Sequence, residues 1–293
     1  MILVDLNQVV ISNLMVQINN YKQEAEEGLV KHMILNSILS IKKKFESDYG
    51  NIILCCDNKN FWRKDVFPHY KGNRKKVREK SGYDWNMIFN TIWQTKKDLR
   101  ETFPYKIIEV ERTEADDVIG TLVKNFSKYE KTLIVSSDKD FKQLQRYPNV
   151  TQYSPILKKY LETKEPYKYI REHIIRGDSG DGVPNFLSDD DVFVTEDKRQ
   201  KPLSRKRLVE WLDINRNPKD FCDSNMLKRY KRNEKLVDLS FVPQEIQDKI
   251  IEEFHKEPEG DMNKVFNYFI ENKMVLMMDE ISSFREAKYA VYV

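Results

Sequence analysis

The chain has 293 residues with 40% hydrophobic and 12% aromatic content, which is the composition of a globular protein of one large domain or two domains of ordinary size. Its 50 Lys and Arg residues nearly balance 47 Asp and Glu residues, so the net charge of +3 says less than the distribution of charge along the chain. No apolar run approaches the roughly 18 residues of a membrane span, and no basic leader precedes the first apolar residues, so we expect neither a membrane nor a secreted protein. Cys55, Cys56 and Cys222 have no metal-site spacing and are expected to be reduced thiols in a cytoplasm.

Two short β-branched runs near the N-terminus each end at an acidic residue. Residues 2–4 are followed by Asp5, and residues 52–56 by Asp57. Runs of this length and composition are typical of buried strands. Between them, residues 30–45 carry apolar side chains at helical spacing, which predicts a helix that covers the sheet.

The segment from Lys59 to Lys80 contains nine basic residues against two acids, with aromatic residues between them. A solvated surface helix or a disordered basic loop is the ordinary interpretation of such a run. This run, however, leaves the carboxyl end of a strand that ends in an acid. Cations beside aromatic faces are what a phosphate backbone and unstacked bases require, so the position favours contact with nucleic acid.

A helix is predicted to follow from Asp84 to Phe103, where Pro104 ends it. Apolar residues recur along it at helical spacing and form one apolar side. These residues are Trp85, Ile88, Phe89, Ile92, Trp93 and Leu99.

Two more predicted strands also lead to acids. Residues 107–110 precede Glu114, Asp116 and Asp117, and residues 132–135 precede Asp138 and Asp140. Each group has a simpler explanation, because acids cap helices and favour their first turns, with Thr113 as the N-cap in the first case. The recurrence of acids at four strand ends argues for a shared site instead, since ligands of parallel α/β sheets bind in the crevice beyond the carboxyl ends of the strands.

Such an acidic crevice needs cations. Two carboxylates about 4 Å apart repel by roughly 4 kcal/mol at an effective dielectric near 20. Hard divalent ions such as Mg²⁺ or Mn²⁺ are the natural compensation.

The glycine-rich segment 177–185 carries two more acids, Asp178 and Asp181. Turns favour Asp and Gly for conformational reasons alone. A calcium loop is excluded because Gly180 and Gly182 stand where side-chain oxygens are required. The two acids are instead candidates for a second metal site.

The remaining chain is predicted to be mainly helical, with helices at residues 208–212, 243–254 and 261–270. Residues 188–207 begin with three acids and end with basic residues, which indicates an exposed loop or ribbon, and residues 282–293 show no pattern. We therefore predict an α/β domain at residues 1–155 and a helical region at residues 156–293.

The order of these motifs resembles the 5′-nuclease family of flap endonucleases and polymerase-associated 5′→3′ exonucleases, and most of all its phage ribonuclease H branch. The resemblance runs from residue 1 to about residue 185 and more weakly to about residue 250. It implies a PIN-like or resolvase-like core with a mostly parallel central sheet and flanking helices. It also implies a basic arch at about residues 58–84 and a duplex-binding region with a helix-turn-helix-like loop near residues 177–185.

The resemblance also implies the roles of the site residues, with two Mg²⁺ or Mn²⁺ ions in one active site. The first ion is expected among Asp5, Asp57, Glu114, Asp116 and Asp138, with Asp117 beside them. The second is expected at Asp140, Asp178 and Asp181. Lys71 matches the arch lysine that contacts the scissile phosphate, Arg63 matches a basic residue near the base of the arch, and both are expected to act in catalysis with Asp116 and Asp138. Nucleic-acid contacts are expected from Arg63, Tyr70, Lys71, Arg74, Lys75 and Lys76, with Tyr70 stacking on an unpaired nucleotide.

One departure from the family pattern lies after Asn185. Residues 186–207 lack the second glycine-rich turn and the Lys-Thr-Ala sequence that grips duplex in most of the family, so a potassium site is not expected. We expect the duplex to be gripped by Arg205, Lys206 and Arg207 instead.

The expected function is a divalent-metal-dependent 5′→3′ exonuclease and flap endonuclease with ribonuclease H activity. It would remove RNA primers and adjacent DNA during lagging-strand replication or repair, by two-metal hydrolysis that leaves a 5′ phosphate. Its substrates would be RNA·DNA hybrids and nicked or branched duplexes, and a free 5′ end would thread through the arch. The resemblance implies a cytoplasmic monomer, in the host cell if phage-encoded, with a single-stranded-DNA-binding protein and a sliding clamp as partners.

Two other functions were weighed. A metal-dependent ribonuclease of the toxin type is disfavoured, because such domains are far shorter and lack the basic insertion. A non-catalytic nucleic-acid-binding module is disfavoured, because an inactive relative would tolerate Asn or Ser at several of the carboxylate positions, and every expected acid is present.

Overall fold

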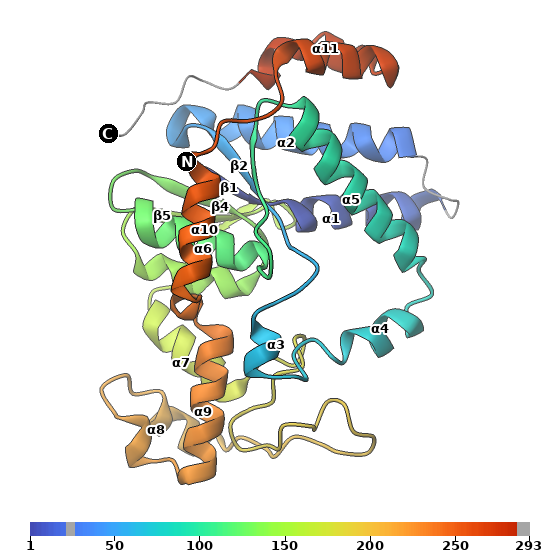
Figure 1. Ribbon diagram of the computed structural model, residues 1–293. Coiled ribbons are helices and arrows are strands. Elements are labelled where there is room, and N and C mark those ends of the chain that lie inside the picture. Colours follow the sequence, from blue (N-terminus) through green and yellow to red (C-terminus); the bar gives the residue numbers. More distant parts are fainter. Residues whose placement is uncertain (22–26, 286–293) are drawn as a thin grey trace.

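The computed structural model describes residues 1–21 and 27–285, which form a six-stranded sheet between layers of helices (Figure 1). The strand order is β3-β2-β1-β4-β5-β6, and every neighbouring pair is parallel except β5 and β6. The predicted mostly parallel α/β sheet is therefore confirmed. The strands are β1 (Ile2–Asp5), β2 (Ile52–Cys55), β3 (Lys106–Ile108), β4 (Thr132–Val135), β5 (Val150–Ser154) and β6 (Lys159–Leu161).

Both faces of the sheet are buried, because alternate residues of each strand point to opposite sides. On one face, Ile2 and Val4 join a core formed with α1 (Leu6–Tyr21), α2 (Glu27–Tyr49) and α5 (Trp85–Thr102). On the other face, Leu3 packs with a second core. That core includes residues of α6 (Ala115–Phe126), the 3-10 helix η1 (Lys139–Arg146) and α10 (Gln244–His255).

The strand order places a topological switch point at the start of the chain. β1 pairs with β2 on one side and with β4 on the other, so the connections leave its two sides in opposite directions. In open α/β sheets the crevice beyond the carboxyl ends at such a point binds ligands. Asp5 is the last residue of β1, and Asp138 follows the end of β4 as the N-cap of η1.

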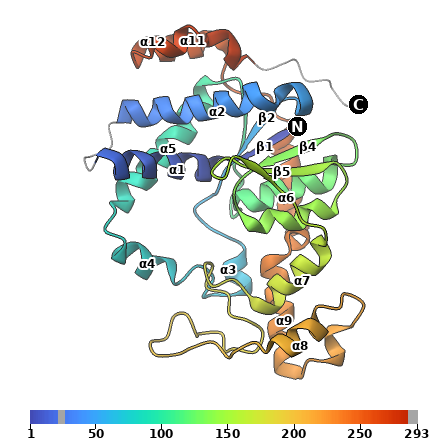
Figure 2. The same cartoon turned by 180° about the vertical axis from the view of Figure 1, so that it is seen from behind.

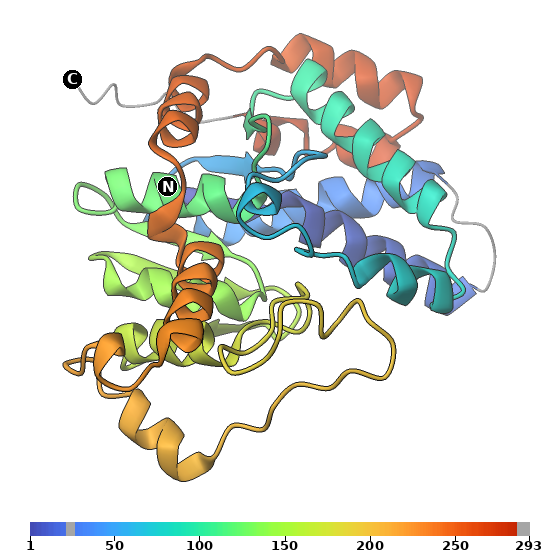
Figure 3. The same ribbon diagram turned by 60° about the horizontal axis from the view of Figure 1, so that its bottom comes forward.

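The predicted arch connects β2 to α5 and contains two short helices, α3 (Arg63–Val66) and α4 (Arg74–Lys80). Figures 1 and 3 show it leaving the sheet and returning along α5, with the segment that follows α7 passing near it. The contacts agree with this view, because the Nζ atom of Lys76 lies 3.7 Å from a carboxylate oxygen of Glu196.

The C-terminal half does not form a separate unit, so the division expected at residue 155 differs from the packing. β6 extends the sheet to Leu161, and α7 (Pro166–Arg176), α8 (Arg205–Trp211) and α9 (Ser224–Val237) build a small core of their own. The chain then returns to the sheet, where α10 packs on one face and α11 (Met262–Glu271) and α12 (Val275–Met278) on the other, as the rear view shows (Figure 2). Apolar surface on these last helices explains the return.

Other local predictions also need correction. The helix α1 was not predicted, and α2 extends beyond the predicted residues 30–45. The turn after α7 leads into an extended segment up to Ser204 rather than into a second helix, so the expected helix-turn-helix is absent from the described part of the chain. Residues 286–293 of the unassigned C-terminal stretch lie outside the described residues, but Phe284 just before them is buried in the core.

The predicted helix at 84–103 is confirmed as α5, with Asp84 as its N-cap. Thr113 is not the N-cap of α6. Glu114 takes that position, because its side chain and that of Asp117 form a capping box with each other's backbone amides. Among the described residues, no helix is long and apolar enough to cross a membrane.

Candidate active site

A groove of about 1140 Å³ opens at the carboxyl edge of the sheet, and eight of the nine predicted acidic ligands line it. The convergence follows from the topology, because these acids end parallel strands, begin the helices after them or lie in the turn after α7. The eight residues are Asp5, Asp57, Glu114, Asp116, Asp138, Asp140, Asp178 and Asp181. The ninth acid, Asp117, is fully buried behind the groove.

Asp5 and Asp57 are fixed by hydrogen bonds at the ends of β1 and β2. Asp5 accepts from the backbone amide of Gln8 at 3.1 Å, and Asp57 accepts from the amides of Ala115 and the Asn7 side chain, each at 2.7 Å. Burial, and then the neighbouring charge of Asp57, raises the pKa of Asp5 to about 7. The protein therefore holds these carboxylates in an arrangement that an added cation would favour.

Glu114 lies at the start of α6 and is neutralised by two basic residues of the arch. The guanidinium of Arg63 donates to it at 2.8 Å, and the ammonium of Lys71 donates to its other oxygen. Burial by itself raises the pKa of Glu114, but the charges of Lys71 and Arg63 outweigh it and lower the pKa to about 2. Lys71 thus lies in the acidic groove, at the position that the resemblance implied for the arch lysine.

The backbone at Lys71 reinforces this placement. Its φ of 58° is left-handed, a conformation that costs a non-glycine residue roughly 1–2 kcal/mol. The Lys71 amide donates to the backbone carbonyl of Asp181 at 2.7 Å, and the guanidinium of Arg74 pairs with the Asp181 carboxylate. The base of the arch is therefore tied to the turn after α7.

Arg63 is 2% exposed, and its donors are used within the protein. It donates to the Leu236 carbonyl at 2.9 Å and pairs with Asp117 at 2.7 Å and with Glu114. In this structure Arg63 has no surface to offer a phosphate, which corrects the expectation of a nucleic-acid contact. Its position assigns it to holding Glu114 and Asp117, and Asp117 to holding Arg63.

Tyr70 is also placed differently from the expectation. Its ring is 4% exposed and packs with Phe67, Val183 and Leu236 instead of offering a face to an unpaired nucleotide. Its hydroxyl contacts Glu114 at 2.8 Å and Asp181 at 2.9 Å. Tyr70 therefore connects acids from the two predicted metal sites.

Asp116 and Asp138 lie where α6 and β4 approach each other. Asp138 accepts the backbone amide of Asp140 at 2.9 Å, so the capping role and the groove position coexist. Burial, followed by the charge of Asp138, raises the pKa of Asp116 well above its ordinary value. Mutual repulsion of this kind is expected where acids are collected for a cation.

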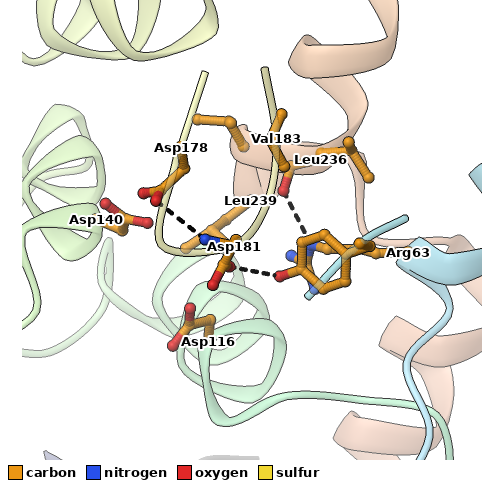
Figure 4. Close-up of a pocket in the computed structure, with 10 residues that line it drawn as sticks. Arg63, Asp116, Asp140, Asp178, Asp181, Val183, Leu236 and Leu239 are labelled. Carbon is orange, nitrogen blue, oxygen red and sulfur yellow. Dashed lines mark hydrogen bonds between the residues drawn. The ribbon is translucent and has the colours of Figure 1, made fainter. Parts of the chain in front are cut away.

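The turn after α7 presents Asp178 through a hydrogen-bonded loop. The Asp178 carboxylate accepts from the amides of Gly180 at 2.7 Å and Asp181 at 3.2 Å. A side chain at Gly177 is excluded, because a Cβ there would lie 2.3 Å from the carbonyl oxygen of Val183 and φ is 66°. Figure 4 shows the carboxylates of Asp116, Asp140, Asp178 and Asp181 around one small space.

His173 completes this side of the groove, and the sequence reasoning missed it. Its Nε2 lies 3.1 Å from Asp178 and its Nδ1 3.5 Å from Asp140. The only sequence signal was its place on α7, five residues before Asp178, and it falls in no motif. A hydrogen bond from His173 is the main reason that the pKa of Asp178 is depressed, whereas burial raises the pKa of Asp140 to about 7.

Asp140, His173 and Asp178 have the donor set and geometry for a metal ion. One ligand atom from each lies within 4.8 Å of the others. The side chain of His173 is 7% exposed, and neither its Nδ1 nor Oδ1 of Asp140 makes a hydrogen bond in the described structure. Carboxylate and imidazole donors suit divalent ions such as Mn²⁺, so the residues present fit the group.

The other predicted nucleic-acid residues lie outside this groove. Lys75 and Lys76 are exposed on α4, and Arg205, Lys206 and Arg207 are exposed on the first turn of α8. Their side chains are free to meet a phosphate backbone at a distance from the acids. Their roles stay predictions.

Comparisons with known proteins agree with this architecture. Residues 1–174 match the family model of the 5′-3′ exonuclease N-terminal resolvase-like domain, and residues 166–284 match that of the T4 RNase H C-terminal domain. Ribonuclease H of Enterobacteria phage T4 is 33% identical over 290 residues, which cover 96% of this chain and 95% of that protein. The 5′-3′ exonuclease of Buchnera aphidicola is 29% identical over 56% of this chain and 57% of its own length.

Solved structures show the same fold. The T5 D15 protein co-crystallised with metal ions superposes with a TM-score of 0.60 at 16% identity, over 86% of this chain and 96% of that one. The bacteriophage T5 flap endonuclease in a complex with DNA and metal ions gives 0.61 at 18% identity, over 87% and 99%. The predicted resolvase-like 5′-nuclease core is thus confirmed, and the chain belongs to the 5′-3′ exonuclease family.

Proposed function

We propose that this 5′ nuclease removes RNA primers and adjacent DNA by divalent-metal-dependent hydrolysis of phosphodiester bonds. The observation that carries the proposal is the convergence of eight carboxylates and His173 in one groove, with Lys71 of the arch among them. The likeness to phage T4 ribonuclease H over nearly the whole chain supports the primer-removing role.

Two Mg²⁺ or Mn²⁺ ions are proposed for the groove. Asp5, Asp57, Glu114, Asp116 and Asp138 would hold one, and Asp140, Asp178, Asp181 and His173 the other. Such ions, when bound, activate water and stabilise the leaving oxygen of an in-line displacement. The close packing of acids with raised pKa values supports this occupancy, because uncompensated carboxylates repel one another.

The residues of the arch would act on the substrate itself. Lys71 is 14% exposed and reaches the acids from the arch side, so its ammonium is placed to stabilise charge that develops on the scissile phosphate. Leaving Glu114 for the phosphate requires that Glu114 gains another cation. Substrate contact by Lys71 and metal binding at Glu114 would therefore accompany each other.

Outside the groove, Arg74, Lys75 and Lys76 would contact the single strand, and Arg205, Lys206 and Arg207 the duplex. The proposed substrates are RNA·DNA hybrids, nicked duplexes and 5′ flaps in a host cytoplasm. A single-stranded-DNA-binding protein and a sliding clamp stay expected partners, without a docking surface assigned to them.

The test of the proposed function is the size of products from a 5′-labelled duplex in Mg²⁺. Nicked DNA, flapped DNA and an RNA-primed strand are compared, with wild type beside Asp138→Asn. Short labelled products that disappear in chelator and in the variant are expected. Intact substrate with retained tight binding would overturn the proposal and favour a non-catalytic binding module.

The duplex contact has a separate test. Replacing Arg205, Lys206 and Arg207 together by Ala should weaken duplex binding and lower the slope of its salt dependence by up to about three phosphate contacts. Equal affinity of variant and wild type across a salt series would reject this surface.

A further inference from the structure

The helix α5 carries an aromatic surface that its packing does not bury. Ile88, Ile92 and Leu99 of the predicted apolar side are buried, but Phe89 is 46% exposed and Trp93 is 53% exposed. Large exposed aromatics grouped on one surface mark interaction sites more often than isolated ones do. The exposed rings therefore form a second surface of α5, distinct from the one that covers the sheet.

The rings recur at every fourth residue. Trp85, Phe89 and Trp93 are about 6 Å apart along the helix axis, and the first two ring centroids are separated by 5.8 Å. Consecutive positions at this spacing lie on one side of a helix. An extended single strand can therefore place successive unstacked bases on successive rings.

Cations accompany each ring. The guanidinium carbon of Arg78 lies 6.0 Å from the ring centre of Trp85 and 5.5 Å from that of Phe89, and the Nζ of Lys97 lies 5.7 Å from that of Trp93. Interleaved aromatic faces and cations bind single-stranded nucleic acid, because the rings take the bases and the cations take the phosphates.

The surface also continues the arch. Arg78 belongs to α4, and the indole N–H of Trp85 donates to Ser81 at 2.8 Å, so the first ring is tied to the end of the arch. Figure 1 shows α5 running away from α4 along the outside of the molecule. A strand that leaves the arch meets this helix next.

We propose that this surface of α5 binds the single-stranded 5′ arm of a flapped substrate, with Phe89 and Trp93 as stacking residues and Arg78 and Lys97 as phosphate contacts. The inference rests on the proposed nuclease function, which supplies the flap. It adds the path that the flap takes beyond the arch.

The test compares affinities for flapped and unflapped duplexes of the same sequence. Proteins carry Asp138→Asn so that the substrates stay intact in Mg²⁺. The variant Phe89→Ser with Trp93→Ser is compared with Tyr129→Ser. Tyr129 is a matched control because it is 69% exposed on another part of the chain and has the Nζ of Lys128 4.5 Å from its ring.

The double variant should lose roughly tenfold or more of the affinity ratio of flapped to unflapped duplex, from the loss of base stacking. The control should keep the ratio of the parent protein. Trp93→Phe retains a ring and should restore most of the ratio, whereas Trp93→Leu should not. Thermal melting of each variant identifies any that fails to fold, and the Phe and Leu pair then decides alone.

An unchanged ratio in the double variant would overturn the inference, as would equal ratios for Trp93→Phe and Trp93→Leu, since an apolar protein-docking surface predicts the latter. Cleavage by the unmodified protein separates this failure from that of the proposed function. Wild type that cuts flapped and nicked duplex with an unchanged ratio refutes only the α5 surface. Wild type that cuts neither refutes the nuclease.

Discussion

The two sides of the acidic groove are neutralised in different ways. On the side built by the strand ends, Glu114 is paired with Arg63 and Lys71, which both come from the arch. On the side built by the turn after α7, Asp140 and Asp178 surround His173, which comes from the helix just before that turn.

This difference separates what is fixed from what can move. Arg63 and His173 are buried and locally anchored, whereas Lys71 and Arg74 reach the acids from the arch and are more exposed. A cation that binds the strand-end side must compete with arch residues, but one that binds the turn side competes with a histidine of the scaffold. Metal binding should therefore affect the arch mainly through the strand-end side.

The largest effect should come from removing the buried cation. Arg63→Met leaves Glu114 and Asp117 without their partner in an interior position, which should lower the free energy of unfolding by about 3–5 kcal/mol. Arg112→Met is the matched control, because Arg112 and Asp65 form an exposed pair, and it should cost at most about 1 kcal/mol. Urea denaturation in chelator measures both. Equal losses in the two variants would show that burial does not distinguish these pairs.

The next effect concerns the mobile cation. Lys71→Met should reduce the rate of cleavage by about 10²–10³-fold, because charge developing on the phosphate loses a nearby donor. Its fold should survive, since Lys71 borders the groove instead of filling the core. Single-turnover cleavage compared with Lys75→Met, an exposed arch lysine, is the measurement. A Lys71 variant no slower than the Lys75 variant would remove Lys71 from the reaction.

The strand-end side was largely predictable from sequence, and the turn side was not. Asp5, Asp57, Glu114, Asp116 and Asp138 adjoin strands with clear apolar runs, and parallel strands bring their carboxyl ends together. The packing of α7 against η1, which places His173 beside Asp140, depends on tertiary contacts that no local pattern encodes.

The same limit explains the misplaced arch residues. Composition marked Arg63 and Tyr70 as surface groups of a basic segment, but the segment folds back at its base onto α9 and the turn after α7. Their partners Leu236 and Asp181 lie more than a hundred residues away in the chain. The return of α10 and α11 to the sheet was missed for the same reason, because amphipathic helices show that they pack but not against what.

A smaller effect should come from the histidine of the turn side. His173→Gln removes the imidazole between Asp140 and Asp178 and should weaken Mn²⁺ binding by about 10–100-fold. Calorimetric titration with Mn²⁺ alone measures this without reference to catalysis. His255→Gln, at an exposed histidine of α10, is the control and should bind as wild type. If both variants bind Mn²⁺ equally well, His173 serves the fold and not the ion.

The smallest effect concerns stability and pH in the absence of metal. The pKa values of Asp5 and Asp140 are raised to about 7 from 3.8, so the folded state binds more protons than the unfolded state between these values. Stability must then fall as pH rises through this window, by about 1 kcal/mol per group between pH 6 and pH 8. The pKa of His173 is also raised, which adds a loss of the same sign.

Added Mg²⁺ should remove this dependence, because it favours the ionised carboxylates that repulsion and burial disfavour. Urea denaturation of the chelated protein at pH 6 and pH 8 should show the loss, and the gain from Mg²⁺ should be larger at pH 8. Asp5→Asn should flatten the metal-free profile by its share, whereas Asp48→Asn, at an exposed acid, should leave the profile as it is. A metal-free protein that becomes more stable toward pH 8 would contradict the strained state assigned to both sides of the groove. It would mean that the arch cations and His173 already compensate the acids in full.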